Sequence, residues 1–207
     1  MQEFETVQEQ FWAGDFGNEY VNRNQEDVLV ANNIALFAKI FAETKNVKSL
    51  IEFGANIGLN LQAIKQLIPQ IEISAVEINQ QAFQALQELK YVNSYQDSIL
   101  KFTTNNKYDF VLVKGVLIHI NPDKLAQVYE LLYTVTSRYI CIAEYYNPKP
   151  VEVTYRGHQD KLFKRDFAGD MLERFKDLQL KNYGFVYHRD SQFPQDDLTW
   201  FLLKKTV

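Results

Sequence analysis

Several features that would define a protein class at once are scarce in this sequence. Among 207 residues there is one cysteine, Cys141, which permits no intrachain disulfide and no cysteine metal cluster. No apolar run approaches the roughly 18 residues of a membrane span, and the polar opening MQEFETVQEQ does not resemble a signal peptide. With 22 basic and 26 acidic residues, the net charge of −4 argues against a nucleic-acid or membrane-surface binder. We expect a cytoplasmic protein with no nucleic-acid, membrane or metal partner.

The composition of the chain indicates one folded domain. Hydrophobic residues make up 46% and aromatic residues 14%, which excludes a disordered chain. A length of 207 residues suits one well-buried α/β domain and is too short for two large ones. We see no repeat, low-complexity tract or domain-sized linker. The sequence therefore predicts a single domain over residues 1–207.

The most informative stretch is residues 47–58, VKSLIEFGANIG. Its apolar run stops at Gly54, and apolar residues recur at helical spacing from Leu61 onward, which predicts a strand, a tight loop and a helix. A glycine turn lets the backbone approach a ligand closely, and the free amide groups of the following helix start favour a polar or anionic one. An ordinary glycine turn between a strand and a helix is the alternative.

The spacing within this loop distinguishes two classes of cofactor. The dinucleotide pattern G-x-G-x-x-G has its third glycine five positions after the first, whereas Gly54 and Gly58 lie four apart. An acid followed by three alternating small positions, here Glu52, Gly54, Asn56 and Gly58, resembles the loop of S-adenosylmethionine (SAM)-dependent methyltransferases. Asn56 stands where that family usually has its middle glycine. Asparagine is among the few other residues enriched at positive φ, so the turn can form.

A second acid follows the next predicted strand. Residues 71–76 are predicted to form that strand, which ends at Glu77. In doubly wound folds an acid at this position reaches the ribose hydroxyls of an adenosine-containing ligand, because a carboxylate can accept a hydrogen bond from each of them. The loop and the acid together favour a cofactor of that kind.

The remaining chain alternates between predicted strands and helices. Further strands are predicted at residues 91–95, 108–113, 139–143, 183–188 and 199–203. Helices with N-cap side chains are predicted to start at Asn79, Asn121 and Asp166. By contrast, residues 11–24, FWAGDFGNEYVNRN, show no clean period, and we predict no regular element there. The N-terminal segment, residues 1–25, either caps an opening of the core or folds over the cofactor as a lid that carries Tyr20 and Arg23.

The whole pattern resembles the class I SAM-dependent methyltransferases. The resemblance covers nearly the whole chain and implies a Rossmann-like α/β fold, with a seven-stranded, mostly parallel sheet of order 3-2-1-4-5-7-6 and helices on both faces. Four segments look like the pseudaminic acid biosynthesis-associated methylase family: FWAGDFGNEYVNRN, KGVLIHINPDKL, EYYNPKPVEVTYRGHQDKLFKRDF and YGFVYHRDSQFPQDDLTWFLL. That family implies SAM as methyl donor and a role in nonulosonic-acid or other surface-glycan biosynthesis.

The predicted cofactor residues lie in the N-terminal segment and at the carboxyl ends of the strands. They are Tyr20, Arg23, Glu52, Gly54, Ala55, Asn56, Gly58, Glu77, Ile78, Asp97, Ser98, Lys114, Gly115 and His119. Asp97 and Ser98 follow the third strand, where polar side chains meet the adenine amine or serve as ordinary turn residues. Methyl transfer requires alignment and exclusion of water rather than a metal. Asp190, Asp196 and Asp197 match no calcium loop and are assigned to turn capping.

Two histidines are candidates for catalysis. His119 is predicted at the crevice beyond the fourth strand, and its unperturbed pKa near neutrality suits a general base for a hydroxyl acceptor. The alternative is that His119 holds the neighbouring helix start or the edge of SAM. His158 is the second candidate.

A basic run after the fifth strand, residues 145–165, is predicted to face the substrate. Arginine and lysine beside tyrosine suit a phosphorylated or carboxylated sugar, because arginine forms paired bonds to either group and aromatic rings pack on sugar faces. The predicted substrate residues are Tyr145, Tyr146, Tyr155, Arg156, Lys164 and Arg165. A merely solvated charged loop is the alternative.

Three functions stay open at this point. The first is methylation of a small acidic sugar or sugar nucleotide by a monomer or homodimer. The second is an NAD(P)-dependent oxidoreductase, against which stand the glycine spacing and the lack of a Tyr-x-x-x-Lys pair. The third is a non-catalytic SAM-binding protein.

Overall fold

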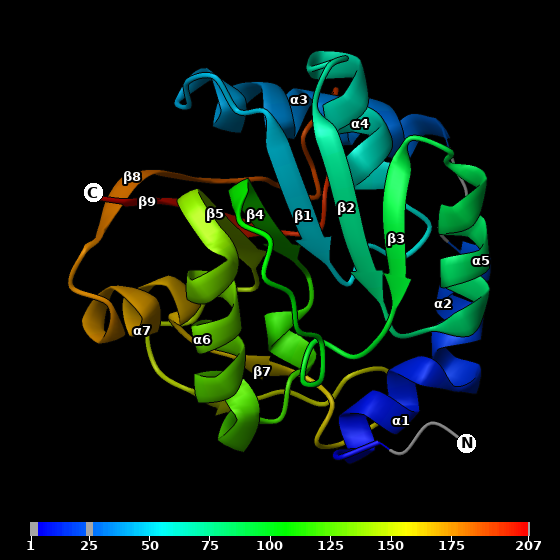
Figure 1. The fold of residues 1–207 in the computed structure, drawn as a ribbon. Helices are drawn as coiled ribbons and strands as arrows, with labels where there is room; N and C mark the ends of the chain where they lie inside the picture. Colours follow the sequence, from blue (N-terminus) through cyan, green and yellow to red (C-terminus); the bar gives the residue numbers. More distant parts are fainter. Residues whose placement is uncertain (1–3, 24–26, 207) are drawn as a thin grey trace.

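The computed structural model describes residues 4–23 and 27–206, and a seven-stranded sheet forms their centre (Figure 1). Its strands are β1 (Ser49–Phe53), β2 (Glu72–Glu77), β3 (Val92–Gln96), β4 (Tyr108–Lys114), β5 (Thr136–Glu144), β8 (Leu178–Phe185) and β9 (Thr199–Lys205). Their order is β3-β2-β1-β4-β5-β9-β8, and β9 runs antiparallel to the other six strands. The predicted order and the antiparallel last strand are confirmed. The prediction for β8 was wrong in its bounds, because that strand begins at Leu178.

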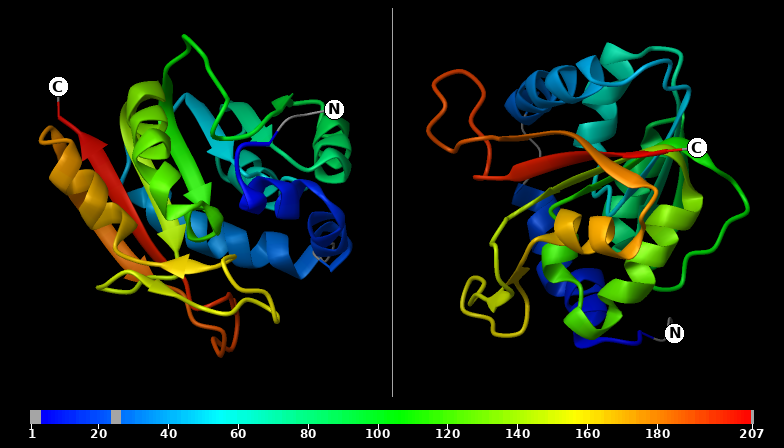
Figure 2. Two further views of the ribbon diagram at one scale, coloured as in Figure 1. Left: turned by 90° about the horizontal axis from the view of Figure 1, so that it is seen from below. Right: turned by 90° about the vertical axis from the view of Figure 1, so that its left-hand side faces the viewer.

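Helices cover both faces of the sheet, as predicted (Figures 1 and 2). They are α1 (Val7–Ala13), α2 (Asp15–Arg23), α3 (Asp27–Ala42), α4 (Leu59–Leu67), α5 (Gln80–Glu88), α6 (Leu125–Val135) and α7 (Phe167–Arg174), with 3-10 turns at η1 (Leu117–His119) and η2 (Pro122–Lys124). Asn79, Asn121 and Asp166 accept the predicted N-cap hydrogen bonds from backbone N–H groups. No helix of the described ranges is long and apolar enough to cross a bilayer.

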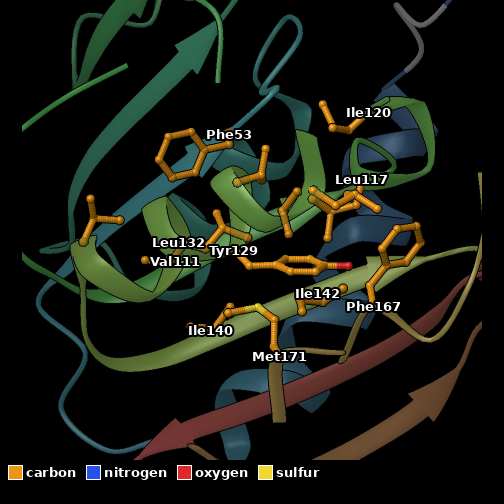
Figure 3. Packing of buried hydrophobic residues seen from close by; sticks show 14 of the residues in the cluster. Phe53, Val111, Leu117, Ile120, Tyr129, Leu132, Ile140, Ile142, Phe167 and Met171 are labelled. Carbon is orange, nitrogen blue, oxygen red and sulfur yellow. The ribbon is translucent and has the colours of Figure 1, made fainter. Parts of the chain in front are cut away.

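The alternation of side chains along each strand divides the core between the two faces. Leu50 packs towards α3 and α4, whereas its neighbour Ile51 packs towards α6 and α7. Figure 3 shows the second of these clusters, in which Tyr129 of α6 lies among Met171 and Phe167 of α7. Both faces of the parallel strands are therefore buried, and the open edge that remains for a ligand lies at the strand ends.

The prediction for residues 11–24 was wrong, because the described part of this segment is helical. Thr6 caps α1 and forms a capping box with Glu9, and α2 follows after one residue. The segment shows no clean period because Gly14, with an extended backbone, separates the two helices. The rings of Phe11 and Phe16 stack across this break at 4.1 Å between centroids. Residues 1–3, 24 and 25 of the predicted cap lie outside the described residues.

The basic run contains a small hairpin that the sequence did not predict. Strands β6 (Val151–Glu152) and β7 (Phe163–Lys164) pair in antiparallel fashion. Arg156 and Gly157 turn the chain between them with φ values of 50° and 86°. Figure 1 shows α1 and β7 beyond the ends to which β1, β2 and β3 point, and α2 beside α5. Residues of α1 and α2 line one cavity together with the strand ends, so the N-terminal helices lie at the carboxyl edge of the sheet.

Candidate functional site

A cavity of about 310 Å³ lies at the carboxyl edge of the sheet. Its wall comes from the ends of β1, β2, β3 and β4, from α1, α2 and α3, and from the loop before β9. Most of the predicted cofactor residues line it: Tyr20, Gly54, Ala55, Asn56, Glu77, Ile78, Asp97, Ser98, Lys114, Gly115 and His119. Arg23, Glu52 and Gly58 are not among the lining residues. The structure thus brings together residues from four strand ends that lie far apart in the sequence.

The glycine loop after β1 owes its shape to three residues in the left-handed region. Gly54, Asn56 and Gly58 have φ values of 71°, 49° and 81°. A Cβ on Gly54 would lie 2.4 Å from Cγ2 of Val116, and one on Gly58 would lie 2.6 Å from Cδ1 of Leu89. Both glycines are therefore needed for two reasons: they adopt positive φ, and they leave room for the side chains of Val116 and Leu89. Asn56 adopts the positive φ predicted for it.

Glu77 ties this loop to the end of β2. Its Oε2 accepts a hydrogen bond from the backbone N–H of Asn56 at 2.7 Å, and its Oε1 accepts one from the N–H of Asn79, also at 2.7 Å. Burial raises the pKa of the carboxyl group, and the backbone donors oppose that rise. Each oxygen keeps a second lone pair, so the carboxylate can still accept from hydroxyl groups of a ligand in the cavity.

Glu52 lies beneath the loop rather than in the cavity wall. Its side chain is completely buried, and Oε1 accepts a hydrogen bond from Nδ2 of Asn60 at 2.6 Å. Burial raises the pKa of Glu52 to about 8. In this structure the acid links β1 to the first turn of α4, and its predicted contact with the cofactor stays a prediction.

The N-terminal helix closes the cavity near the end of β3. The carboxylate of Glu9 accepts a hydrogen bond from the hydroxyl of Ser98 at 2.5 Å and one from the N–H of Thr6 at 2.9 Å. Glu9 and Trp12 line the cavity, and neither was predicted as a site residue from the sequence. The pattern Thr6-x-x-Glu9 is a capping-box signature and would have indicated a helix start here.

An aromatic wall surrounds His119 at the mouth of the cavity. Its ring lies 4.5 Å from the ring of Trp12 and 5.0 Å from that of Tyr155, measured between centroids. Nδ1 lies 2.5 Å from the carbonyl oxygen of Lys161, which can only accept, so Nδ1 carries the proton of the neutral ring. Burial lowers the pKa of His119 to about 4. Nε2 is therefore an unprotonated acceptor at neutral pH.

The predicted substrate residues do not line the cavity, although part of the basic run packs against its mouth. Tyr155 contacts His119 through its ring, and the guanidinium carbon of Arg156 lies 5.9 Å from the centroid of Tyr155. His158, the second catalytic candidate, packs on Phe11 with 5.0 Å between ring centroids and is exposed.

The other predicted substrate residues lie near β5, β9 and α7. Nζ of Lys164 lies 5.0 Å from the ring centroid of Tyr145. Arg165 forms an ion pair with Asp170 of α7, with 2.7 Å between Nε and Oδ2. Tyr146 forms a bridge with Arg165 through the backbone. Because Arg165 already has a carboxylate partner, its predicted contact with the substrate requires that this pair open.

The loop between β8 and β9 also enters the site, which the sequence did not indicate. Nδ2 of Asn32 donates to the carbonyl oxygen of Pro194 at 2.7 Å, and Nε2 of Gln195 donates to that of Asn32 at 2.8 Å. These reciprocal bonds hold the loop on α3 and bring Asp196, assigned above to turn capping, to the cavity wall beside Lys114. No local pattern signals such a contact between residues 162 positions apart.

Comparison with known proteins agrees with this fold. A family model described as "Methyltransferase domain" matches residues 51–137. The plantazolicin methyltransferase BpumL in complex with S-adenosylhomocysteine (SAH) is 13% identical, with 97% of this chain and 95% of that chain covered and a TM-score of 0.68. A Burkholderia thailandensis 1,6-didemethyltoxoflavin-N1-methyltransferase with bound 1,6-didemethyltoxoflavin and SAH is 12% identical, with coverages of 100% and 94% and a TM-score of 0.70. The N-methyltransferase NodS from Bradyrhizobium japonicum WM9 is 12% identical, with coverages of 88% and 99% and a TM-score of 0.66. No curated protein sequence matches.

The sheet order and these similarities define the class I methyltransferase fold for this chain. The narrower resemblance to the pseudaminic acid methylase family stays a prediction. The neighbours methylate chemically different acceptors, so the fold alone does not name the acceptor of this chain.

Proposed function

We propose that this chain is a SAM-dependent methyltransferase whose acceptor is an acidic sugar or sugar nucleotide of nonulosonic (pseudaminic) acid or related surface-glycan biosynthesis. The position of Glu77 is the main support for methyltransferase activity: its carboxylate accepts a hydrogen bond from the N–H of Asn56 in the glycine loop, and the residue lines the cavity. It occurs within residues 51–137, which match the methyltransferase domain.

The residues present fit SAM. A Cβ added to Gly115 would meet no atom within 4 Å, so this strand end, with φ of 68°, leaves open space beside the cavity. Nε1 of Trp12 and Oδ1 of Asn56 are buried without a hydrogen-bond partner among the described residues. Buried polar atoms of this kind are expected to find a partner, and here a polar ligand supplies it. Glu77 would hold the ribose, and Asp97 with Ser98 would meet the adenine.

The chain's own residues align the acceptor and exclude water. When bound, SAM supplies an electrophilic methyl group on a sulfonium. Tyr20 and Trp12 of the N-terminal helices, 5.4 Å apart between ring centroids, cover the cavity and keep water from that group. Nε2 of His119 accepts a hydrogen bond from the acceptor hydroxyl and orients its oxygen along the line of displacement. The N-terminal helices thus act as the lid in this proposal.

Phe11 and Phe16 pack on Trp12 of the aromatic wall, and positive charge on these two rings supports an acidic acceptor. Nζ of Lys161 lies 5.5 Å from the ring centroid of Phe11, and the guanidinium carbon of Arg23 lies 5.5 Å from that of Phe16. Arg156 extends the same surface at the hairpin turn. A sugar can pack on the rings while its carboxylate or phosphate pairs with these cations. Residues 145–165 therefore act as the substrate-facing segment.

A methyl-transfer assay tests this function. The protein is incubated with SAM carrying a radioactive methyl group and with pseudaminic acid, its cytidine monophosphate conjugate, and uncharged sugars of the same size. We expect label in the acidic compounds only, with loss in Glu77→Ala and retention in Glu88→Ala, whose side chain is exposed on α5. Label in the uncharged sugars alone would overturn the acidic acceptor. SAH binding without transfer to any compound would favour a non-catalytic SAM-binding protein.

A further inference from the structure

Lys114 has a position that the proposed contacts leave unexplained. It is the last residue of the central strand β4, and its side chain lines the cavity. Among residues 4–23 and 27–206, no hydrogen bond or ion pair of its side chain is present, although lysine carries three donors. A partly buried amine facing a cavity without a partner is available to a ligand or to a proton.

The groups around Lys114 come from every element packed against it. Glu52 approaches from β1, Glu144 and the thiol of Cys141 from β5, and Asp196 from the loop before β9, none of them within ion-pair distance. Asn32 and Asn33 of α3, whose side-chain amides are neutral, also line the cavity.

Two of these acids are already engaged by neutral donors. Oε1 of Glu144 accepts from the N–H groups of Val116 and Leu117 at 3.0 and 2.9 Å, and Glu52 accepts from the amide of Asn60. Burial raises the pKa of Glu144 to about 7 and that of Glu52 to about 8, and it lowers the pKa of Lys114. The same burial therefore disfavours charge on the amine and on both carboxyl groups.

The position of Lys114 along the sheet separates it from the adenosine end of the cavity. Glu77 ends β2 and Asp97 follows β3, whereas Lys114 ends β4, which lies on the other side of β1. A nucleoside held at Glu77 and Asp97 therefore extends its sulfur towards β4. Asp196, which reaches the cavity wall beside Lys114, belongs to the half of the site left for the acceptor.

We propose that Lys114 is the general base of the methyl transfer, and this inference rests on the proposed function. As the acceptor O–H bond breaks, its proton passes to Nζ of Lys114. The oxygen forms a bond to the methyl carbon while the S–CH3 bond breaks, and the electron pair of that bond stays on sulfur, giving SAH. The products are a methyl ether, SAH and protonated Lys114, which returns its proton to solvent through the open cavity.

In this assignment Lys114 and His119 have different roles. The imidazole donates through Nδ1 to Lys161, and its pKa of about 4 makes it too weak a base to hold a proton at neutral pH. It orients the acceptor, and Lys114 removes the proton. General bases of suitable pKa contribute roughly 10²- to 10⁴-fold to rate, which sets the expected effect of removing the amine.

The first test needs no acceptor. Trace acetylation with acetic anhydride, which attacks neutral amines, is followed by peptide mass spectrometry over a pH series in the SAH complex. We expect Lys114 to become reactive at lower pH than the exposed Lys204 on β9 of the same molecule. Titration of Lys114 together with Lys204 would overturn the proposal. Weaker labelling of Lys114 in the SAH complex than in the free protein would overturn it as well. So would an absence of labelling at Lys114 in both the free protein and the SAH complex.

The second test uses Lys114→Met, which removes the amine, and Lys114→Arg, which keeps a positive charge but cannot act as a base at these pH values. With the pseudaminic acid conjugate as acceptor, we expect both variants to lose about 100-fold or more in kcat and the rise of kcat with pH. SAH affinity should be unchanged, and Lys204→Met should behave as the wild type.

The alternatives give different results in the same experiments. Rescue of kcat by Lys114→Arg would make Lys114 a holder of an anionic acceptor, and an equal loss of SAH affinity would make it a cofactor contact; either result overturns the base. If the wild type fails to bind SAH, the proposed function fails. If it binds SAH and methylates none of the acidic compounds, the acceptor class fails, and the acetylation series still decides the role of Lys114.

Discussion

The carboxylate of Glu77 should determine both cofactor affinity and the shape of the glycine loop. Two backbone N–H groups, from Asn56 and Asn79, each donate to it over 2.7 Å. Alanine at this position removes the ribose acceptor and leaves both donors without a partner. A hydrogen bond to a charged group contributes about 1.5–3 kcal/mol, so we expect Glu77→Ala to weaken SAH binding by about 10- to 150-fold.

Glu77→Ala should lower the free energy of unfolding by less than the loss of two hydrogen bonds to a charged group would. Burial raises the pKa of Glu77, so the folded chain already carries a desolvation penalty for this charge, and alanine relieves it. Glu77→Gln separates the two contributions. Its amide keeps one acceptor oxygen but turns an NH2 group towards Asn56 or Asn79, so the loop distorts although the size of the side chain is preserved.

Calorimetric titration with SAH and urea denaturation of the same samples check these expectations. Glu88→Ala on the exposed face of α5 serves as the matched control. Affinity that stays at the wild-type value in Glu77→Ala would remove Glu77 from the site and refute the argument. An equal loss in the control would show that the effect does not come from the cavity.

Three further expectations concern the loop, the buried acid and the basic run. Asn56 has φ of 49°, so Asn56→Gly should keep its stability in urea denaturation, whereas Asn56→Ala should lose about 1 kcal/mol; equal stabilities would contradict this. The folded pKa of Glu52, about 8, exceeds its unfolded value, so the folded state binds more protons and the free energy of unfolding falls as pH rises between 4.5 and about 8. Glu52→Gln should flatten this fall in melting temperature, and an unchanged slope would refute the assignment. Arg165→Ala breaks a partly exposed ion pair with Asp170 and should lower the free energy of unfolding by less than about 1 kcal/mol. Arg165→Ala and Arg156→Ala should both keep SAH affinity but lose turnover. Loss of SAH affinity in either variant would assign that arginine to the cofactor pocket or to the structure.

The fold was predictable because its signals are local and repeated. The apolar run before Gly54 and the spacing after it define one strand and one helix, and N-cap residues such as Asp166 define others. Strand order followed from the resemblance to a known family and not from these patterns. The helices of residues 11–23 escaped prediction because Gly14 has an extended backbone and separates two short helices, so no single helical period runs through the segment.

The site was predictable only where it lies at strand ends. Glu77 and Asp97 could be assigned to the cavity because parallel strands end at one edge of the sheet. Asp196 could not, because its position depends on the two hydrogen bonds that hold its loop on α3. Nor could the partner of Arg165 be foreseen, since an ion pair with Asp170 requires the tertiary placement of α7. Site residues at strand ends can be predicted once the strands are located in the sequence. Site residues in long loops can be assigned only from the folded structure.

One measurement tests the central claim most directly: calorimetric titration of the wild-type protein with SAH and, in a separate sample, with NAD. The cavity formed by Gly54, Glu77 and Gly115 predicts saturable binding of SAH at a single site and no heat from NAD. Binding of NAD without binding of SAH would contradict the account and favour the oxidoreductase.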